Sequence, residues 1–338
     1  MAYQLKLDIY YFSLNKIKKE YNRKHRGKTI KGYKTEESQT LFGDYIESIK
    51  NDDNNDYMNC LLRSFIKGFY DSFKTDSKNS KALSITSGMY SGFNSNNYTA
   101  WGVFKGGTTG ISREVFKTNN ATHLTGIIDE DNVTSLPFFY KIWMPKDSNI
   151  GILMVQSYTS IGCTTLFREL LDTFFVETGY KPTWSKCIPN DYIKKYLQNG
   201  FIQKIQVLYT KRDKERPLDP IFKPFAKARR STMFSNFKMP ICNLLQMGNY
   251  QKVLKAQIKA IDANFNEDDD IVILFYENNG KRAHALLASI ENILPVITLD
   301  DTLMNEKTQI PKWDELHNFT DGLLETIKSQ INYSPKRI

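Results

Sequence analysis

Two segments of the chain concentrate the side chains that bind phosphate. Residues 15–34 hold nine Lys or Arg and one Glu, and residues 204–238 hold ten Lys or Arg against three acids. We call them the first and the second basic segment. Lysine neutralises phosphate charge, and arginine adds two-pronged hydrogen bonding to phosphate oxygens. The whole chain has a formal net charge of +9, so the rest is net negative. This localised charge favours a localised anionic partner, for which we predict nucleic acid.

Aromatic residues alternate with the cations in the second basic segment. Bases stack on such rings, each stack being worth ~1–3 kcal/mol. However, Phe222 and Phe225, and then Phe234 and Phe237, are three residues apart, a spacing that in a helix is typical of core packing. We therefore assign nucleic-acid contact to the cations and core packing to the rings. The predicted nucleic-acid-binding residues are Arg23, Lys24, Arg26, Lys28, Arg212, Lys223, Lys227, Arg229, Arg230 and Lys238.

Two other classes of function stay open. A metal-dependent nuclease needs carboxylates that converge on Mg²⁺, and the best set in this sequence is Asp270, Glu277 and Lys281. In the alternative interpretation, these residues only flank the turn of a hairpin. A non-enzymatic assembly subunit would use the basic segments to dock an acidic protein, or would form a homo-oligomer. The balance favours a binding protein over an enzyme, with no catalytic residue assigned.

Neither a cofactor nor a metal is predicted. The glycines of KGGTTG (Gly106, Gly107 and Gly110) match neither the P-loop nor the dinucleotide-binding spacing. The four cysteines lie far apart without a CxxC pair, which argues against structural zinc and for a reduced compartment. No apolar stretch approaches the ~18–20 residues that span a bilayer, and neither basic segment has the continuous apolar stripe of a membrane-surface helix. We expect a cytoplasmic protein without direct membrane insertion.

The periodicity of apolar residues predicts the elements that must position these side chains. Residues 3–12 alternate as a strand, and the first basic segment, interrupted by Gly27 and Gly32, reads as a loop or a short helix with a loop. Predicted helices cover residues 41–49, 57–73 and 164–178, the last ending at Gly179. Between residues 82 and 159, short β-like runs separated by Gly, Asn and Asp predict a largely antiparallel region.

The second half of the chain also combines predicted strands with predicted helices. Strands are predicted at residues 181–188, 201–210 and 295–299, and helices at residues 250–263 and 314–331. The turn Asn278–Asn279–Gly280 between two apolar runs predicts a hairpin, because Asn-Gly supplies the positive φ angles of a tight turn. The class is α+β, a largely antiparallel β region flanked by amphipathic helices. We expect two subdomains, residues 1–180 with the first basic segment and residues 181–338 with the second.

One stretch resembles a known family. Within residues 131–175, SLPFFYKIWMP is followed by a polar turn, then GILMVQSYTSIGCTT and the helix TTLFRELLDTFF. This order is similar to that of RexA-like phage-exclusion proteins and related bacterial anti-phage defence proteins. The resemblance implies a cytosolic DNA-binding protein that acts during phage infection, with a membrane or effector partner. It carries over no catalytic residue, and the first basic segment has no counterpart in it.

Overall fold

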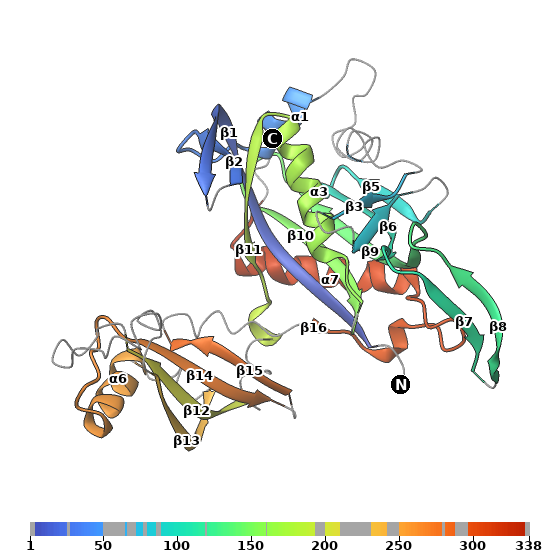
Figure 1. Ribbon diagram of the computed structural model, residues 1–338. Helices are drawn as coiled ribbons and strands as arrows, with labels where there is room; N and C mark the ends of the chain where they lie inside the picture. Colours follow the sequence, from blue (N-terminus) through green and yellow to red (C-terminus); the bar gives the residue numbers. More distant parts are fainter. Residues whose placement is uncertain are drawn as a thin grey trace. The chain divides into compact units, whose positions relative to one another are not determined.

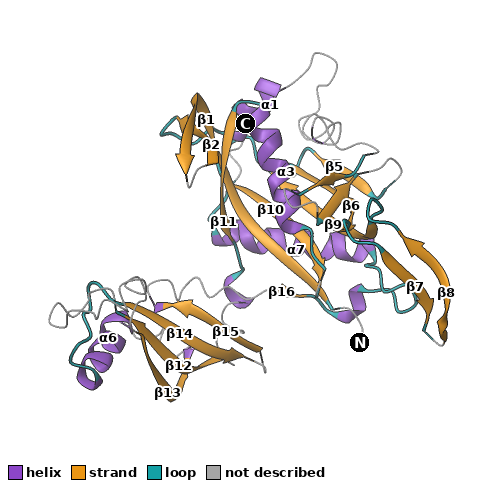
Figure 2. Ribbon diagram, in the orientation of Figure 1, coloured by secondary structure: helices purple, strands orange, loops and turns teal. Residues whose placement is uncertain are grey.

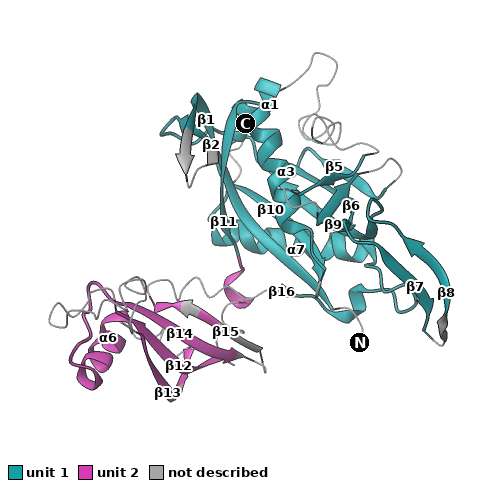
Figure 3. Cartoon of the chain, in the orientation of Figure 1, with its two compact units in different colours: residues 1–187, 296–338 teal, residues 188–295 magenta. Residues whose placement is uncertain are grey.

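The computed structural model describes residues 4–25, 28–49, 65, 72–76, 80–85, 89–118, 120–159, 161–192, 200–209, 231–241, 250–278, 281–287 and 297–334. The chain divides into two compact units, unit 1 with residues 1–187 and 296–338, and unit 2 with residues 188–295 (Figure 3). The sequence had suggested a division at residue 180, with everything after it in the second half. Instead, the chain returns to unit 1 at Val296.

Unit 1 is built on one antiparallel sheet. Its strands, in spatial order, are β11 (Tyr180–Lys186), β1 (Leu5–His25), β10 (Gly151–Tyr158), β9 (Thr134–Trp143), β6 (Thr99–Thr108), β4 (Lys81–Ser84) and β3 (Lys74–Thr75). Three strands lie off this path: β2 (Lys28–Thr35) and β16 (Ile297–Thr298) pair with β1, and β5 (Ser91–Asn94) pairs with β6. A separate hairpin consists of β7 (Arg113–Lys117) and β8 (Asn120–Ile128) (Figure 1).

Helices cover both faces of this sheet (Figure 2). On one face, the ring of Tyr140 in β9 lies 5.0 Å from that of Phe167 in α3 (Thr164–Glu177). Lys141, the next residue of β9, bonds to α7 (Trp313–Gln330) on the other face, as period-two alternation requires. Because both faces are covered, the central strand β10 is buried at every position. The short 3₁₀ helix η3 (Asp301–Leu303) precedes α7.

These observations confirm the α+β class and the antiparallel region between residues 82 and 159. The predicted helices at residues 41–49, 164–178 and 314–331 correspond to α1 (Phe42–Ile49), α3 and α7. Gly179 stops α3 with a φ of +90°. Most of the predicted helix at residues 57–73 lies outside the described residues. Phe65 within it is helical and buried against Phe167 and Phe174 of α3.

Unit 2 contains a four-stranded antiparallel sheet with the order β13 (Ser231–Pro240), β12 (Gly200–Leu208), β14 (Ile271–Asn278) and β15 (Lys281–Leu286). Leu254 and Ile258 of α6 (Tyr250–Ile261) are part of the hydrophobic core of this unit. The predicted hairpin is confirmed, since Asn278 pairs with Lys281. Phe234 packs against the core from a strand, so its core role is as expected although the helical spacing assumed for it is wrong.

Among the described residues, no helix is both long enough and apolar enough to cross a membrane.

Candidate nucleic-acid interface

The first basic segment is a β-ribbon, whereas the sequence had suggested a loop or a short helix. Strand β1 pairs with β10 from Leu5 to Phe12 and with β11 from Tyr10 to Lys16. Beyond that point its partner is β2, from Ile17 to His25 (Figure 1). We call this two-stranded part, residues 17–25 with 28–35, the β-ribbon. The prediction was wrong because lysines weaken the sequence signal of a strand. The pairing of β1 with β2 satisfies the hydrogen-bonding groups of the backbone whatever the side chains are.

The base of the β-ribbon is attached firmly to the sheet. The backbone N–H of Ile17 donates to the carbonyl of Gly179 at 2.9 Å, and that of Glu36 donates to the carbonyl of Lys16 at 2.9 Å. The side-chain amide of Asn15 donates to the carbonyls of Glu36 and Ser38, both at 3.2 Å. The ribbon therefore continues a strand whose other half is a buried part of the core.

One face of the β-ribbon carries an aromatic ring next to paired lysines. Tyr21 is the register partner of Gly32, and a methyl group at Gly32 would lie only 2.6 Å from Cζ of Tyr21. The ring thus covers the glycine, a device that stabilises two-stranded sheets. Tyr21 remains 40% exposed. Lys19 and Lys34 are also register partners, and both are exposed.

The pairing of Lys19 with Lys34 is electrostatically unfavourable for the fold. Side chains directly opposite each other on paired strands have Cβ atoms about 5 Å apart, and like charges there are destabilising. Neither lysine forms an ion pair with a described acid, whereas Lys31 reaches Glu20 at 3.6 Å. Exposed lysines also discourage ribbons from pairing edge to edge. A bound anion would remove the repulsion.

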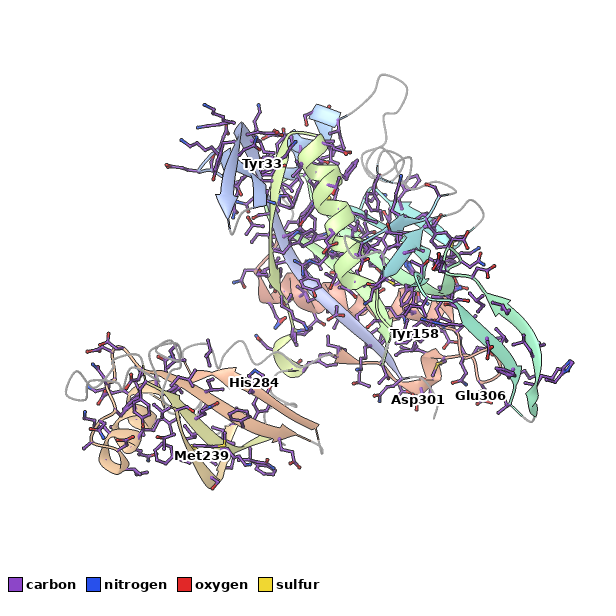
Figure 4. All side chains as sticks on the ribbon, viewed as in Figure 1. Tyr33, Tyr158, Met239, His284, Asp301 and Glu306 are labelled. Carbon is purple, nitrogen blue, oxygen red and sulfur yellow. The ribbon has the colours of Figure 1, made fainter. Side chains whose placement is uncertain are left out.

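The opposite face adds another cation. Tyr33 lies on the β-ribbon among nitrogen-tipped side chains (Figure 4), and Nζ of Lys181 is 5.6 Å from the centre of its ring. Lys181 belongs to β11, where it is the register partner of Asn15. Strand β11 therefore brings a lysine from outside both basic segments to the β-ribbon.

The structure locates only some of the predicted binding residues. It brings Arg23 and Lys24 of β1 and Lys28 of β2 onto the β-ribbon, and it places Lys238 on β13 of unit 2, but the side chains of these four are not described. The others lie outside the described residues: Arg26, Arg212, Lys223, Lys227, Arg229 and Arg230. Sequence reasoning missed Tyr21, Tyr33 and Lys181. The alternation of Lys19, Tyr21 and Arg23 was a local signal for the strand, but Lys181 is brought there by a non-local pairing.

The carboxylates of the proposed nuclease do not converge. Asp270 precedes β14 and Glu277 is near its far end, so at roughly 3.3 Å per residue they are about 20 Å apart along the strand. Asp270 accepts a hydrogen bond from the backbone of Asn266 at 2.8 Å, and Glu277 accepts one from the side-chain amide of Gln203. A single metal ion cannot bridge both carboxylates. The described residues contain no group of three or more His, Cys, Asp or Glu that could hold a metal.

The glycines of KGGTTG also have a structural role. Gly106 and Gly107 belong to β6, and a methyl group at Gly107 would lie 1.8 Å from the carbonyl oxygen of Thr134 in β9. Glycine is needed there because the two strands approach so closely. Gly110, with a φ of +83°, lies in the turn that follows.

A buried charged cluster fastens α7 to the sheet. Nζ of Lys141 donates to Oδ1 of Asp321 at 2.6 Å and to the carbonyl of His317 at 2.9 Å. Nε2 of His317 lies 3.1 Å from Oδ2 of Asp321, and its ring is 4.2 Å from that of Trp101. Burial lowers the pKa of Lys141 to about 8, although Asp321 opposes the shift. Burial and the Lys141 charge lower the pKa of His317. With the Lys141 side chain only 1% exposed, the lysine of this cluster serves to fasten α7 to the sheet.

Comparison of the chain with protein-family models, with curated proteins and with solved structures finds no match.

Proposed function

We propose that this protein binds nucleic acid through the phosphate backbone, using the β-ribbon of unit 1. The supporting observation is the facing pair Lys19 and Lys34 beside the exposed ring of Tyr21. Lysines on a two-stranded ribbon can follow a phosphate backbone, and ribbons of this kind fit the major groove of DNA. Lys181 from β11 adds a cation beside Tyr33 on the opposite face of the β-ribbon.

The proposal keeps three further elements of the sequence analysis. Sequence specificity is weak, because no recognition helix, zinc finger or RNA-binding signature occurs in the sequence. DNA is favoured over RNA, and the second basic segment contributes additional phosphate contacts. We propose a cytoplasmic location, with which the two free, buried thiols of Cys163 and Cys187 are consistent. We also propose a role in anti-phage defence. The defence role rests only on the resemblance of residues 131–175.

Salt dependence of binding is the direct test. If about six phosphates are contacted, the log–log slope of affinity against salt is on the order of −5 for duplex DNA. Changing Lys19 and Lys34 together to alanine should make that slope less negative by about 2. The matched control changes Lys117 and Lys307, exposed lysines of unit 1 away from the β-ribbon, and should change the affinity and the slope much less. A slope near zero, or equal effects of the two double variants, would count against the proposal.

A second candidate function, that of an assembly subunit, is favoured by the β7–β8 hairpin. Its large apolar side chains are unusually exposed: Val115 is 38%, Phe116 40%, Leu124 42% and Ile127 57% exposed. An exposed apolar patch of this kind is typical of a protein–protein contact. Light scattering after nuclease treatment at high salt tests this role. A defined oligomer that dissociates when Phe116 and Ile127 are changed to serine would support it, and a monomer throughout would argue against it.

A further inference from the structure

A groove lies on the α7 face of the sheet, next to the base of the β-ribbon. Its volume is about 350 Å³, at the lower end of the range for small-ligand sites. Tyr11 of β1 is the register partner of Ser185 in β11, and Ser13 is the partner of Thr183. Four hydroxyl-bearing residues therefore occupy neighbouring positions on these two strands. All four line the groove. We call it the hydroxyl groove.

The chemistry of the hydroxyl groove suits an uncharged, planar ligand with mixed hydrogen-bonding edges. Gln39 adds an amide that both donates and accepts, as hydroxyls do. Ile150 and Ile331 supply apolar surface, and none of the described residues that line the groove is charged. A phosphate placed here would lose water without gaining a counter-charge, which is costly. A nucleobase has flat apolar faces and a polar edge, so it meets both requirements.

The hydroxyl groove is continuous with the face of the β-ribbon that carries Tyr33, opposite the face of Lys19 and Lys34. Asn15 and its register partner Lys181 are the next positions on the same face, two residues beyond Ser13 and Thr183. Two residues along a strand cover about 7 Å, comparable with the distance from a base to the phosphate of its own nucleotide. Nζ of Lys181 reaches over Tyr33, which belongs to the β-ribbon. A nucleic-acid strand whose phosphates lie on this face of the ribbon, beside Lys181, therefore passes directly by the groove.

We propose that the hydroxyl groove holds one unpaired base of a single-stranded nucleic acid whose phosphates lie along the β-ribbon. This inference rests on the proposed function and specifies its ligand as single-stranded, or locally unpaired, at this point. Hydroxyls and an amide accept several base edges, so the groove selects for an accessible base and discriminates little between bases.

The test compares an intact strand with an abasic one. Single-stranded DNA and RNA of one length and an abasic DNA of the same length, which keeps every phosphate, are titrated by fluorescence anisotropy at two salt concentrations. The unmodified protein should bind the intact DNA about tenfold more tightly than the abasic strand, because base contacts are worth ~1–3 kcal/mol each. It should bind the intact strand more tightly than the corresponding duplex.

Two sets of variants separate the groove from the ribbon. Changing Thr183 to valine and Ser185 to alanine, both exposed in β11, should lower affinity for the intact strand to that for the abasic strand, which stays unchanged. The matched control changes the exposed residues Thr165 to valine and Ser135 to alanine and should preserve the difference. Changing Lys181, the cation next to the groove, to alanine should weaken binding of the intact and the abasic strand equally.

The outcomes distinguish failure of this inference from failure of the proposed function. Equal, salt-dependent binding of intact and abasic strands, unaffected by the groove variant, overturns the groove assignment and leaves the ribbon proposal standing. Binding of duplex alone also overturns it. If no nucleic acid binds at all, the proposed function fails, and the groove assignment fails with it.

Discussion

Replacing Lys141 with methionine should stabilise unit 1 near pH 7, although it removes a short ion pair. Lys141 is 1% exposed, whereas its partner Asp321 is 46% exposed. Methionine is apolar and of similar length, so it can fill the same space beside β10 and α7. Asp321 is then left in contact with water and with His317, so the loss of its lysine partner costs little.

The magnitude follows from the pKa of Lys141. Its lowering from 10.5 to about 8 means that the protonated side chain costs about 3 kcal/mol in the folded state, even with Asp321 present. The substitution removes this cost but leaves the carbonyl of His317 without its donor, a penalty of about 1–3 kcal/mol. We expect a net gain on the order of 1 kcal/mol. Asp321→Ala should instead destabilise by about 2 kcal/mol, because it strands a buried charge.

The pH dependence gives a sharper test. Because the folded pKa of Lys141 is lowered, the folded state binds fewer protons than the unfolded state between about pH 8 and 10.5. The contribution of Lys141 to stability therefore rises with pH over that window, and the advantage of Lys141→Met should shrink by about 1 kcal/mol between pH 7 and pH 9. Burial raises the pKa of Cys163 and Cys187 to about 11, which has the opposite effect, but both thiols are common to the two proteins.

Tryptophan fluorescence during urea unfolding is the appropriate assay. All four tryptophans, Trp101, Trp143, Trp184 and Trp313, belong to unit 1, so the signal reports this unit alone. The free energy of unfolding is compared for the unmodified protein, Lys141→Met and Asp321→Ala at pH 7 and pH 9. An advantage of Lys141→Met that does not change with pH, or an Asp321→Ala variant as stable as the unmodified protein, would refute the reasoning.

Three further predictions concern the same unit. Gly107→Ala should destabilise it by at least about 2 kcal/mol because the methyl group meets the Thr134 carbonyl, whereas Gly126→Ala, with nothing within 4 Å, should have little effect; urea unfolding of both checks this. In a Cys60→Ser/Cys242→Ser background, Cys163 and Cys187 should react slowly with a thiol reagent at pH 7 and rapidly in urea, since they are buried and their pKa is raised to about 11. Because the pKa of His317 is lowered, the folded state resists its protonation, and the resulting stability is present above pH 6.5 and is lost as the pH falls through the folded value. His317→Gln should therefore lose less stability between pH 7 and pH 5, as measured by tryptophan fluorescence.

Much of the fold could be predicted because its signals are local. The apolar runs of β9 and β10, the alternation of β12 and the amphipathic pattern of α3 each identify their element without knowledge of its neighbours. The turn between β14 and β15 was predicted from Asn-Gly alone. These elements owe their conformation to periodicity and turn chemistry, which the sequence displays directly.

The return of the chain to unit 1 could not be predicted in this way. It depends on β16 pairing with Lys6 and Leu7 of β1, and on Lys141 bonding to α7 about 180 residues later. One sequence signal was nevertheless present. A lysine within FFYKIW interrupts an apolar run that is otherwise buried, and such a lysine requires a partner. The sequence could indicate that a partner exists, but the contact with Asp321 identifies it.

The difference between a loop and a β-ribbon also changes the energetics of the candidate interface. A basic loop would lose conformational entropy on binding, and its lysines could move apart beforehand. In the β-ribbon, the pairing of β1 with β2 fixes Lys19 opposite Lys34 at the backbone, so their repulsion is relieved only by side-chain motion, by salt or by a bound anion. The core of unit 1 therefore holds the cations in place before any ligand arrives, and the conformational cost of binding is already met by the folding of the sheet.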